Sequence, residues 1–137
     1  CRIKKTKYFG GLMKLHENNG EITVVIDVSF TADMNEINQF ILEEQCQFIN
    51  NQEVNSLKKF NWYINEETQT GTLIEVFTNS DGFAELAEKA IGTPVNLKFR
   101  ELFTFEKMTI LGDITETLRT MLESMNPVMK SYKGGLS

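Results

Sequence analysis

Residues 57–78, LKKFNWYINEETQTGTLIEVFT, decide the fold. Two runs rich in aromatic and β-branched residues flank the polar segment NEETQTG, and this pattern predicts a long antiparallel hairpin. Because successive side chains of a strand point to opposite faces, both arms place bulky residues on both faces of the sheet. The sheet therefore needs cover on both sides. Helices of the same chain would supply one cover, and a ligand or a second copy of the chain the other.

The alternation within each arm assigns residues to faces. In the first arm Trp62 and Tyr63 point in opposite directions, and in the second arm Leu73, Glu75 and Phe77 share one face. We expect Tyr63 to share its face with Leu73, Glu75 and Phe77. We also expect this face to be the one that lacks cover from its own chain.

The length and charge of the chain limit its class. Its 137 residues suit one domain with one core. Nineteen acidic residues against fourteen basic ones argue against nucleic acid as a partner, because phosphate binding needs a basic face. No run reaches the roughly 18 apolar residues of a membrane span, so no membrane partner is expected.

The two cysteines, Cys1 and Cys46, are too few for a disulfide framework and lack the spacing of a zinc site. We therefore expect no metal and a cytoplasmic location. Cys46 is interpreted as a small packing residue. For Cys1 several origins stay open: a processed end, a truncation, a tag remnant or a lipid-bearing cysteine. Residues 1–20 are expected to be a flexible lead-in to a single domain over residues 21–137.

The segment before the hairpin predicts one strand and one helix. Residues 21–30 alternate apolar and polar side chains, which indicates a half-buried strand. Residues 34–51 repeat apolar side chains at near-helical spacing, with Thr31 or Asp33 as the expected N-cap. This long helix should pack flat on the sheet.

The segment after the hairpin predicts a second helix, capped by Ser80 or Asp81 and ended by Gly92. Residues 95–111 alternate and are interpreted as a fourth strand, and residues 115–125 form an amphipathic third helix. The tail after it is either a short added strand or a mobile end.

The predicted order is strand, helix, strand, strand, helix, strand. This is the ferredoxin-like βαββαβ order of an α+β fold, with a four-stranded antiparallel sheet and both crossover helices on one face. An extra C-terminal helix follows. The other face of the sheet is then bare.

In this arrangement the chain resembles the antibiotic biosynthesis monooxygenase-like family of the dimeric α+β barrel superfamily. The resemblance covers about residues 21–134 and rests on FNWYINEETQTGTLIEVFTNSDGFAEL, FTFEKMTILGDITETLRTML and PVMKSYKGG. It implies two sheets packed face to face in a homodimer, with a pocket in each subunit between sheet and helices. Members of such families include cofactor-independent oxygenases of polyphenols, haem-degrading enzymes and proteins without known activity.

The chain departs from the haem-degrading members. They use an Asn, a Trp and a histidine on a helix, whereas the only histidine here is His16, in the lead-in. Because an imidazole is the usual axial ligand of haem, the resemblance carries no haem ligand over to this chain. We expect no cofactor.

The predicted faces define the candidate site. Four polar residues are expected to point away from the helices: Asp27, Asn61, Tyr63 and Glu75. A carboxylate pair with an amide and a phenol can orient a phenolic substrate and take its proton. Asp27 and Glu75 are therefore the catalytic candidates. The substrate-binding candidates are Asn61, Tyr63, Trp62 and Phe77. In the alternative interpretation, Glu75 makes cross-strand contacts with Lys59 or Tyr63 in a dimer interface.

Two functions remain after this reasoning. One is a small cofactor-independent monooxygenase-like enzyme that acts on an aromatic or phenolic molecule. The other is a non-catalytic homodimer of the same fold that binds a small ligand or serves assembly. A closed pocket around Asp27 or Glu75 with a raised pKa would favour the enzyme, and a solvated ion pair would favour the binding protein.

Overall fold

The computed structural model describes residues 11–137, so Cys1 and the first half of the predicted lead-in lie outside the described residues. The elements follow one another along the chain as β1 (Leu15–His16), β2 (Ile22–Phe30), α1 (Met34–Gln39), η1 (Phe40–Gln45), α2 (Cys46–Asn51), β3 (Leu57–Asn65), β4 (Thr70–Phe77), α3 (Ser80–Ala90), α4 (Pro94–Leu102), β5 (Phe103–Leu111), α5 (Glu116–Met121), η2 (Glu123–Met125), β6 (Val128–Lys130) and β7 (Gly135–Leu136).

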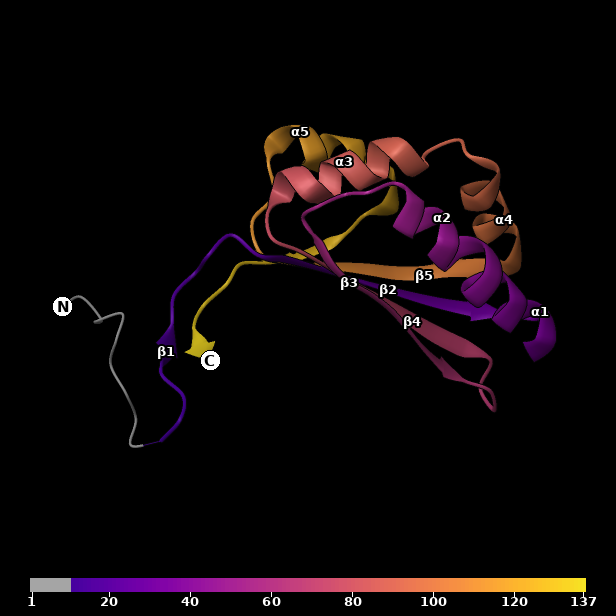
Figure 1. The fold of residues 1–137 in the computed structure, drawn as a ribbon, viewed down its shortest axis with the longest axis horizontal. Helices are drawn as coiled ribbons and strands as arrows, with labels where there is room; N and C mark the ends of the chain where they lie inside the picture. Colours follow the sequence, from indigo (N-terminus) through magenta and orange to yellow (C-terminus); the bar gives the residue numbers. More distant parts are fainter. Residues whose placement is uncertain (1–10) are drawn as a thin grey trace.

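The main sheet has five strands in the order β3-β4-β2-β5-β6. β2 lies at its centre and pairs antiparallel with β4 and β5, whereas β6 pairs parallel with β5. The helices α1 to α5 lie together over one face, and the other face carries none of them (Figure 1). The predicted ferredoxin-like α+β fold is confirmed, with a fifth strand because the tail adds β6. No helix of residues 11–137 is long and apolar enough to cross a bilayer.

The two ends of the described chain meet in a second, two-stranded sheet. β1 pairs antiparallel with β7, and Leu15 faces Leu136 in that pair. Lys14 and Ser137 extend the pairing through two further backbone hydrogen bonds. In Figure 1 this ribbon projects from one end of the main sheet, on the side away from the helices.

The core lies between the covered face of the sheet and the helices. The alternate residues of β2 from Ile22 to Phe30 are buried, while those between them are half-buried. They pack with Leu73 and Phe77 of β4 and with apolar residues of the helices. Burial of these side chains from water is the main stabilisation of such a fold.

The register of the hairpin corrects the predicted faces. Trp62 lies opposite Leu73, and Asn61 lies opposite Ile74. The turn between the two arms has four residues, so even-numbered residues of β3 share a face with odd-numbered residues of β4. Leu73, Glu75 and Phe77 therefore lie on the covered face with Trp62, and the prediction that joined them with Tyr63 is wrong.

Residues 95–111 are only partly a strand. α4 occupies Pro94–Leu102, and β5 begins at Phe103. The Thr93 hydroxyl accepts a hydrogen bond from the Asn96 N–H at 3.3 Å, and Pro94 stands in the first turn, where its missing N–H costs nothing. Val95, Phe99 and Leu102 recur at helical spacing and pack against the core. This start signal outweighs the alternation from which a strand was predicted.

The alternating sequence pattern also failed to predict a bulge in β5. Val28 faces Phe105 and Asp27 faces Lys107, so Glu106 is an extra residue. Met108 consequently points into the core on the same side as Phe103, although simple alternation had put these two residues on opposite faces.

The helix caps agree with the sequence in part. Asp33 caps α1 by accepting a hydrogen bond from the Glu36 N–H at 2.9 Å, as predicted. At α3 the cap is Asn79, whose side chain accepts from the Gly82 N–H at 2.9 Å, so the assignment to Ser80 or Asp81 is wrong. Asn79 has extended backbone angles, the usual conformation of an N-cap, whereas Ser80 is already helical.

Candidate functional site

The six candidate residues lie on two different faces of the sheet. Those on the covered face are Trp62, Glu75 and Phe77, and those on the open face are Asp27, Asn61 and Tyr63. A sheet separates the two sets, so they cannot line one pocket of one subunit. The prediction that all four polar candidates share a face is wrong for Glu75.

Glu75 is a carboxylate in an apolar layer. It is 8% exposed, between the buried Leu73 and Phe77 of its own strand and opposite Val24 and Phe60 of the neighbouring strands. Its side-chain carboxylate makes no hydrogen bond or ion pair with residues 11–137. Burial raises the pKa of the Glu75 carboxyl to about 7, because desolvation disfavours its charged form. Near neutral pH the group can therefore give or take a proton.

The carboxylate of Glu75 is not sealed off from water. Throughout the described part of the chain, every fully buried polar side-chain atom has a hydrogen-bond partner. Because the Glu75 oxygens have no partner, they must keep a small contact with solvent-accessible space. The proposed contacts with Lys59 or Tyr63 are wrong, since those residues lie on the open face.

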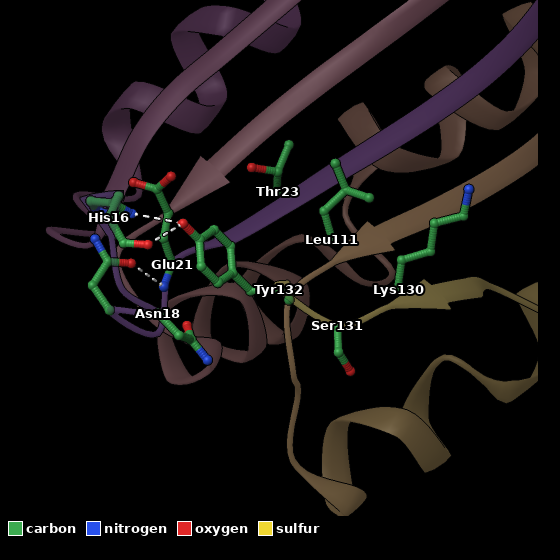
Figure 2. Close-up of a pocket in the computed structure, with 10 residues that line it drawn as sticks. His16, Asn18, Glu21, Thr23, Leu111, Lys130, Ser131 and Tyr132 are labelled. Atoms are coloured by element: carbon green, nitrogen blue, oxygen red, sulfur yellow. Dashed lines mark hydrogen bonds between the residues drawn. The ribbon is translucent and has the colours of Figure 1, made fainter. Parts of the chain in front are cut away.

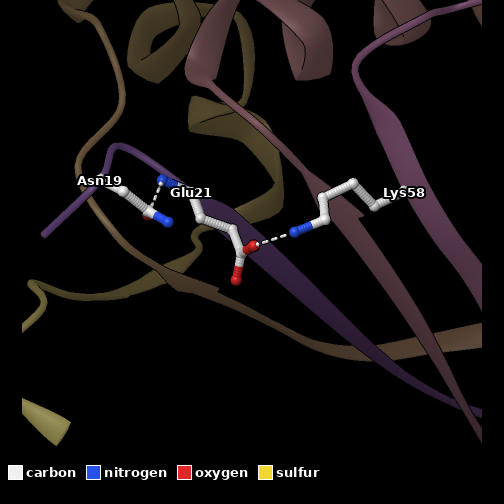
Figure 3. Close-up of polar contacts among 3 residues, drawn as sticks. All are labelled: Asn19, Glu21 and Lys58. Atoms are coloured by element: carbon white, nitrogen blue, oxygen red, sulfur yellow. Dashed lines mark hydrogen bonds and ion pairs between the residues drawn. The ribbon is translucent and has the colours of Figure 1, made fainter. Parts of the chain in front are cut away.

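Glu21 shows how an ordinary carboxylate is placed in this protein. Its Oε2 accepts an ion-pair hydrogen bond from Lys58 Nζ at 2.7 Å, and its backbone N–H donates to Asn19 Oδ1 at 3.0 Å (Figure 3). Its side chain is 37% exposed. Glu75 has neither the partner nor the exposure, and this difference marks it as the unusual acidic group.

A second buried polar residue, Gln45, lies beside Trp62. The Trp62 indole Nε1–H donates to Gln45 Oε1 at 2.7 Å, and Gln45 is 5% exposed. Gln45 and Glu75 are the two polar or charged residues among the buried side chains of residues 11–137. Sequence reasoning missed Gln45, although a signal exists: it continues the four-residue spacing of the buried Ile37 and Ile41.

The helix that carries Gln45 widens at this point. η1 is a π-helix in which the Cys46 N–H donates to the Ile41 carbonyl, one residue further back than in an α-helix. The wider turn brings Phe40, Ile41 and Gln45 to the buried side together. π-Helical segments are rare and are found frequently at functional sites.

An aromatic cluster surrounds the Trp62 indole. Its ring stacks on Phe103 with centroids 4.9 Å apart and meets Phe99 edge-on at 5.9 Å. Phe40 stacks on Phe99 from the helix side. The indole lies across Gly71, where an added Cβ would stand 3.4 Å from Trp62 Cζ3. These rings pack on one another and form an apolar cluster on the covered side of the sheet.

The open face presents a different chemistry. Asp27 accepts a hydrogen bond from the Thr72 hydroxyl at 2.7 Å, and Tyr63 is 57% exposed. Toward the end of the sheet where the chain termini meet, the same face carries the half-buried Ile74 and Val76. With Val25 they are apolar residues of this face, and Thr23, Lys59 and Asn61 lie beside them.

Two hollows on the described surface lie away from Glu75. One has a volume of about 260 Å³ and lies where the ribbon of the two termini meets the sheet (Figure 2). The other, of about 300 Å³, follows α1 and η1. None of the six candidate residues lines either of them. Residues 11–137 contain no cluster of three or more His, Cys, Asp or Glu that could hold a metal.

The fold and the two sheet faces define a class of small ferredoxin-like α+β proteins. MupZ from Pseudomonas fluorescens has this architecture, with a TM-score of 0.62 and 15% identity over 84% of this chain and 92% of that chain. SnoaB, a cofactor-independent oxygenase from Streptomyces nogalater, gives 0.53 and 17% over 70% and 95%, and the protein YJCS gives 0.52 and 15% over 70% and 100%.

These solved structures share the ferredoxin-like α+β fold that the sequence analysis predicted. No protein-family model matches the chain, and no curated protein matches it in sequence. At these identities the solved structures establish the fold alone.

Proposed function

We propose that this protein is a cofactor-independent monooxygenase-like enzyme that oxidises an electron-rich phenol or hydroquinone, with Glu75 as the proton acceptor. The observation that carries the proposal is the buried Glu75 carboxylate, whose pKa is raised to about 7. A general base is most effective when its pKa lies near the working pH. The oxygenase activity of SnoaB, which shares the fold, supports the same reaction class.

The proposed reaction needs only the substrate, oxygen and a base. Glu75 removes the phenolic proton, and the electron-rich phenolate then supplies electrons to O₂. In the balanced reaction a phenol with a free para position loses two hydrogens and becomes a quinone. One oxygen atom forms the new carbonyl, and the other leaves as water with those two hydrogens.

The covered-face candidates take distinct roles in this proposal. Trp62 and the rings around it supply an apolar wall for the substrate ring. Phe77 is completely buried and stacked on Phe83, which favours a supporting role behind the site. Asp27, Asn61 and Tyr63 lie on the other face of the sheet. We therefore no longer propose them as substrate contacts of Glu75.

The enzyme is proposed to be a homodimer that acts in the cytoplasm. The open face carries the half-buried apolar residues Val25, Ile74 and Val76. A second copy packed on this face removes them from water, and a stable interface of this kind buries on the order of 2,000 Å² or more. The cytoplasmic location rests on the presence of only two cysteines in the chain.

Oxygen uptake with a panel of dihydroxy-aromatic compounds tests the proposal, using chelator-treated protein. The wild type should consume oxygen, with a rate that rises as the pH passes through about 7. Glu75→Gln keeps the size of the side chain but cannot take a proton, so turnover should fall by roughly 10²–10⁴-fold. Asp27→Asn, the same change on the open face, is the matched control and should retain the wild-type rate.

The outcomes separate three conclusions. Uptake that Glu75→Gln retains would refute the choice of base, and a loss caused only by Asp27→Asn would move the site to the open face. An inactive wild type across a broad panel would favour the second candidate function, a non-catalytic homodimer. The half-buried apolar residues Val25, Ile74 and Val76 on the open face are the observation that supports this second candidate.

A further inference from the structure

The paired chain ends form an arm that leaves the body of the protein. Within the described chain β1 and β7 pair with each other and with no strand of the main sheet. The ribbon lies beyond one end of the sheet, on the side away from the helices (Figure 1). We call residues 12–16 and 133–137 the terminal arm. A two-stranded ribbon is at best marginally stable by itself in water, so this arm gains stability from any further surface on which it packs.

The arm is held at its base and exposed beyond it. The Tyr132 hydroxyl donates to the His16 carbonyl, and the two rings meet edge-on with centroids 5.9 Å apart (Figure 2). Farther out, three apolar side chains are exposed to water: Leu12, Met13 and Leu136. Apolar side chains that gather on one projecting element mark a contact surface.

The end of the sheet that bears the arm is positively charged. Its lysines without an ion-pair partner among residues 11–137 are Lys14 and Lys133 of the arm and, on the open face, Lys59 and Lys130. Glu17 and Asp113 lie near them, so the balance stays positive.

The opposite end of the open face carries carboxylates. Asp27 accepts a hydrogen bond from the Thr72 hydroxyl, and Glu106 accepts one from the Ser29 hydroxyl, each at 2.7 Å. Neither makes an ion pair with another described residue, and each carboxylate can accept further hydrogen bonds. The exposed Glu66 and Glu67 of the hairpin turn add to the negative charge, and Lys107, opposite Asp27 in the register, offsets only part of it.

This separation of charge distinguishes two ways of packing one open face on another about a two-fold axis. If like ends meet, both arms lie at one end and lysines approach lysines. If opposite ends meet, each arm lies beside the hairpin end of the other copy, where the carboxylates are. Complementary charges favour the second arrangement, because like charges brought together oppose association.

We propose that the terminal arm of each copy packs against the hairpin end of the second copy, with its lysines near the partner subunit's Asp27 and Glu106. This inference rests on the homodimer proposed above and adds its orientation and a second contact. The exposed Leu12, Met13 and Leu136 leave water in the same contact. The arm is thus completed by the partner and not by its own chain.

NMR of mixed dimers tests where the arm lies. One chain is ¹⁵N-labelled, and the other is unlabelled and carries a spin label on Ser137→Cys, both in a Cys1→Ser, Cys46→Ala background. Because the two labels are on different chains, broadening reports contacts between copies alone. It should centre on residues 65–70 and 104–107. A spin label on Glu88→Cys, exposed on α3 among the helices, is the control that should broaden neither segment.

Charge reversal tests what holds the arm. Lys14→Glu with Lys133→Glu should raise the dissociation constant of the dimer about tenfold or more in sedimentation at low salt. Adding Glu67→Lys and Glu106→Lys should recover most of the loss, because opposite charges then meet again. Lys89→Glu with Lys98→Glu makes the same change in net charge on the helices and should leave the dissociation constant unchanged.

The outcomes separate this inference from the homodimer itself. A dimer without broadening at residues 65–70 and 104–107, or with broadening at the partner's own arm, would refute the arm contact and leave the homodimer standing. An unchanged dissociation constant after reversal of Lys14 and Lys133 would do the same. A wild type that stays monomeric would overturn both, and its sedimentation with phosphatidylserine vesicles would assign the arm to a lipid surface instead.

Discussion

The two faces of one sheet differ in what surrounds their carboxylates. On the covered face Glu75 is surrounded by apolar side chains without a hydrogen-bond partner among the described residues, and the pKa of its carboxyl is raised to about 7. On the open face Asp27 is half-buried and accepts a hydrogen bond from Thr72. The faces also differ in cover, since the helices lie over one face and none of them lies over the other. The acid–base chemistry that we propose therefore lies on the first face, and the proposed association on the second.

The largest expected effect concerns the open face. Ile74→Asp places an unpaired charge in the proposed apolar interface, and taking such a charge out of water costs several kcal/mol. The dissociation constant should rise by roughly a hundredfold or more. Sedimentation at micromolar concentration measures this change. Leu97→Asp, at an exposed apolar position on α4, is the control that should stay dimeric. A wild type that sediments only as a compact monomer would refute the interface.

The next effect concerns the covered face. Ile26 is 6% exposed in the centre of the core, so Ile26→Ala should lower the free energy of unfolding by roughly 2–5 kcal/mol. Urea unfolding measures the loss. Ile91 is 62% exposed, and the same truncation there should change the midpoint little. Equal midpoints for the two variants would contradict the assignment of the core.

The raised pKa of the Glu75 carboxyl predicts how the free energy of unfolding depends on pH. The pKa of its carboxyl is about 7 in the folded protein against 4.5 as the reference value, a difference worth about 3 kcal/mol. The neutral form is favoured in the fold, so this stability is fully present below pH 4.5 and is lost as the pH rises through 7. Glu75→Gln should therefore gain stability relative to the wild type over that interval.

Urea unfolding of the wild type and Glu75→Gln from pH 4.5 to 8 measures this difference. Glu88→Gln, which also removes one acidic group but at an exposed position of α3, is the matched control. A constant difference between Glu75→Gln and the wild type at all pH values would mean that Glu75 does not titrate abnormally.

The smallest expected effect concerns Gln45. Gln45→Leu leaves the partly buried indole N–H of Trp62 without its acceptor, which should cost about 1–3 kcal/mol. Trp62 is the only tryptophan, so its fluorescence reports directly on this contact. Gln39→Leu, at an exposed position of the same long helix, should leave both stability and emission unchanged.

Local sequence patterns predicted the positions of helices and strands better than they predicted the sheet face on which each side chain lies. The alternation around Ile26 and the turn after Asn65 gave the central strand and the hairpin with nearly correct ends. The helix from Pro94 was missed because an alternating run and a helical run can share the same apolar residues, and here the Thr93 cap decides between them.

The candidate site was harder to predict for a physical reason. A shift of one residue in the register of two strands moves every side chain of one strand to the other face. The sequence placed Glu75 in the second arm correctly, but the number of turn residues determined which face it shares. The bulge at Glu106 and the π-helical turn before Gln45 are further single-residue irregularities, and the bulge breaks the alternation from which the strand was predicted. Each of them changes which side chains meet.

The position of β3 at the edge of the sheet bears on solubility at high protein concentration. One side of this nine-residue strand has no neighbouring strand within the described chain, so its backbone amides and carbonyls could pair with another molecule. Lys58 and Lys59 lie at the start of this edge, and both are exposed; Lys58 is paired with Glu21, so Lys59 supplies most of the repulsion. Bringing two such edges together would bring their ammonium groups together as well. Repulsion between these lysines should therefore oppose edge-to-edge β-aggregation, and it should weaken as salt screens their charges.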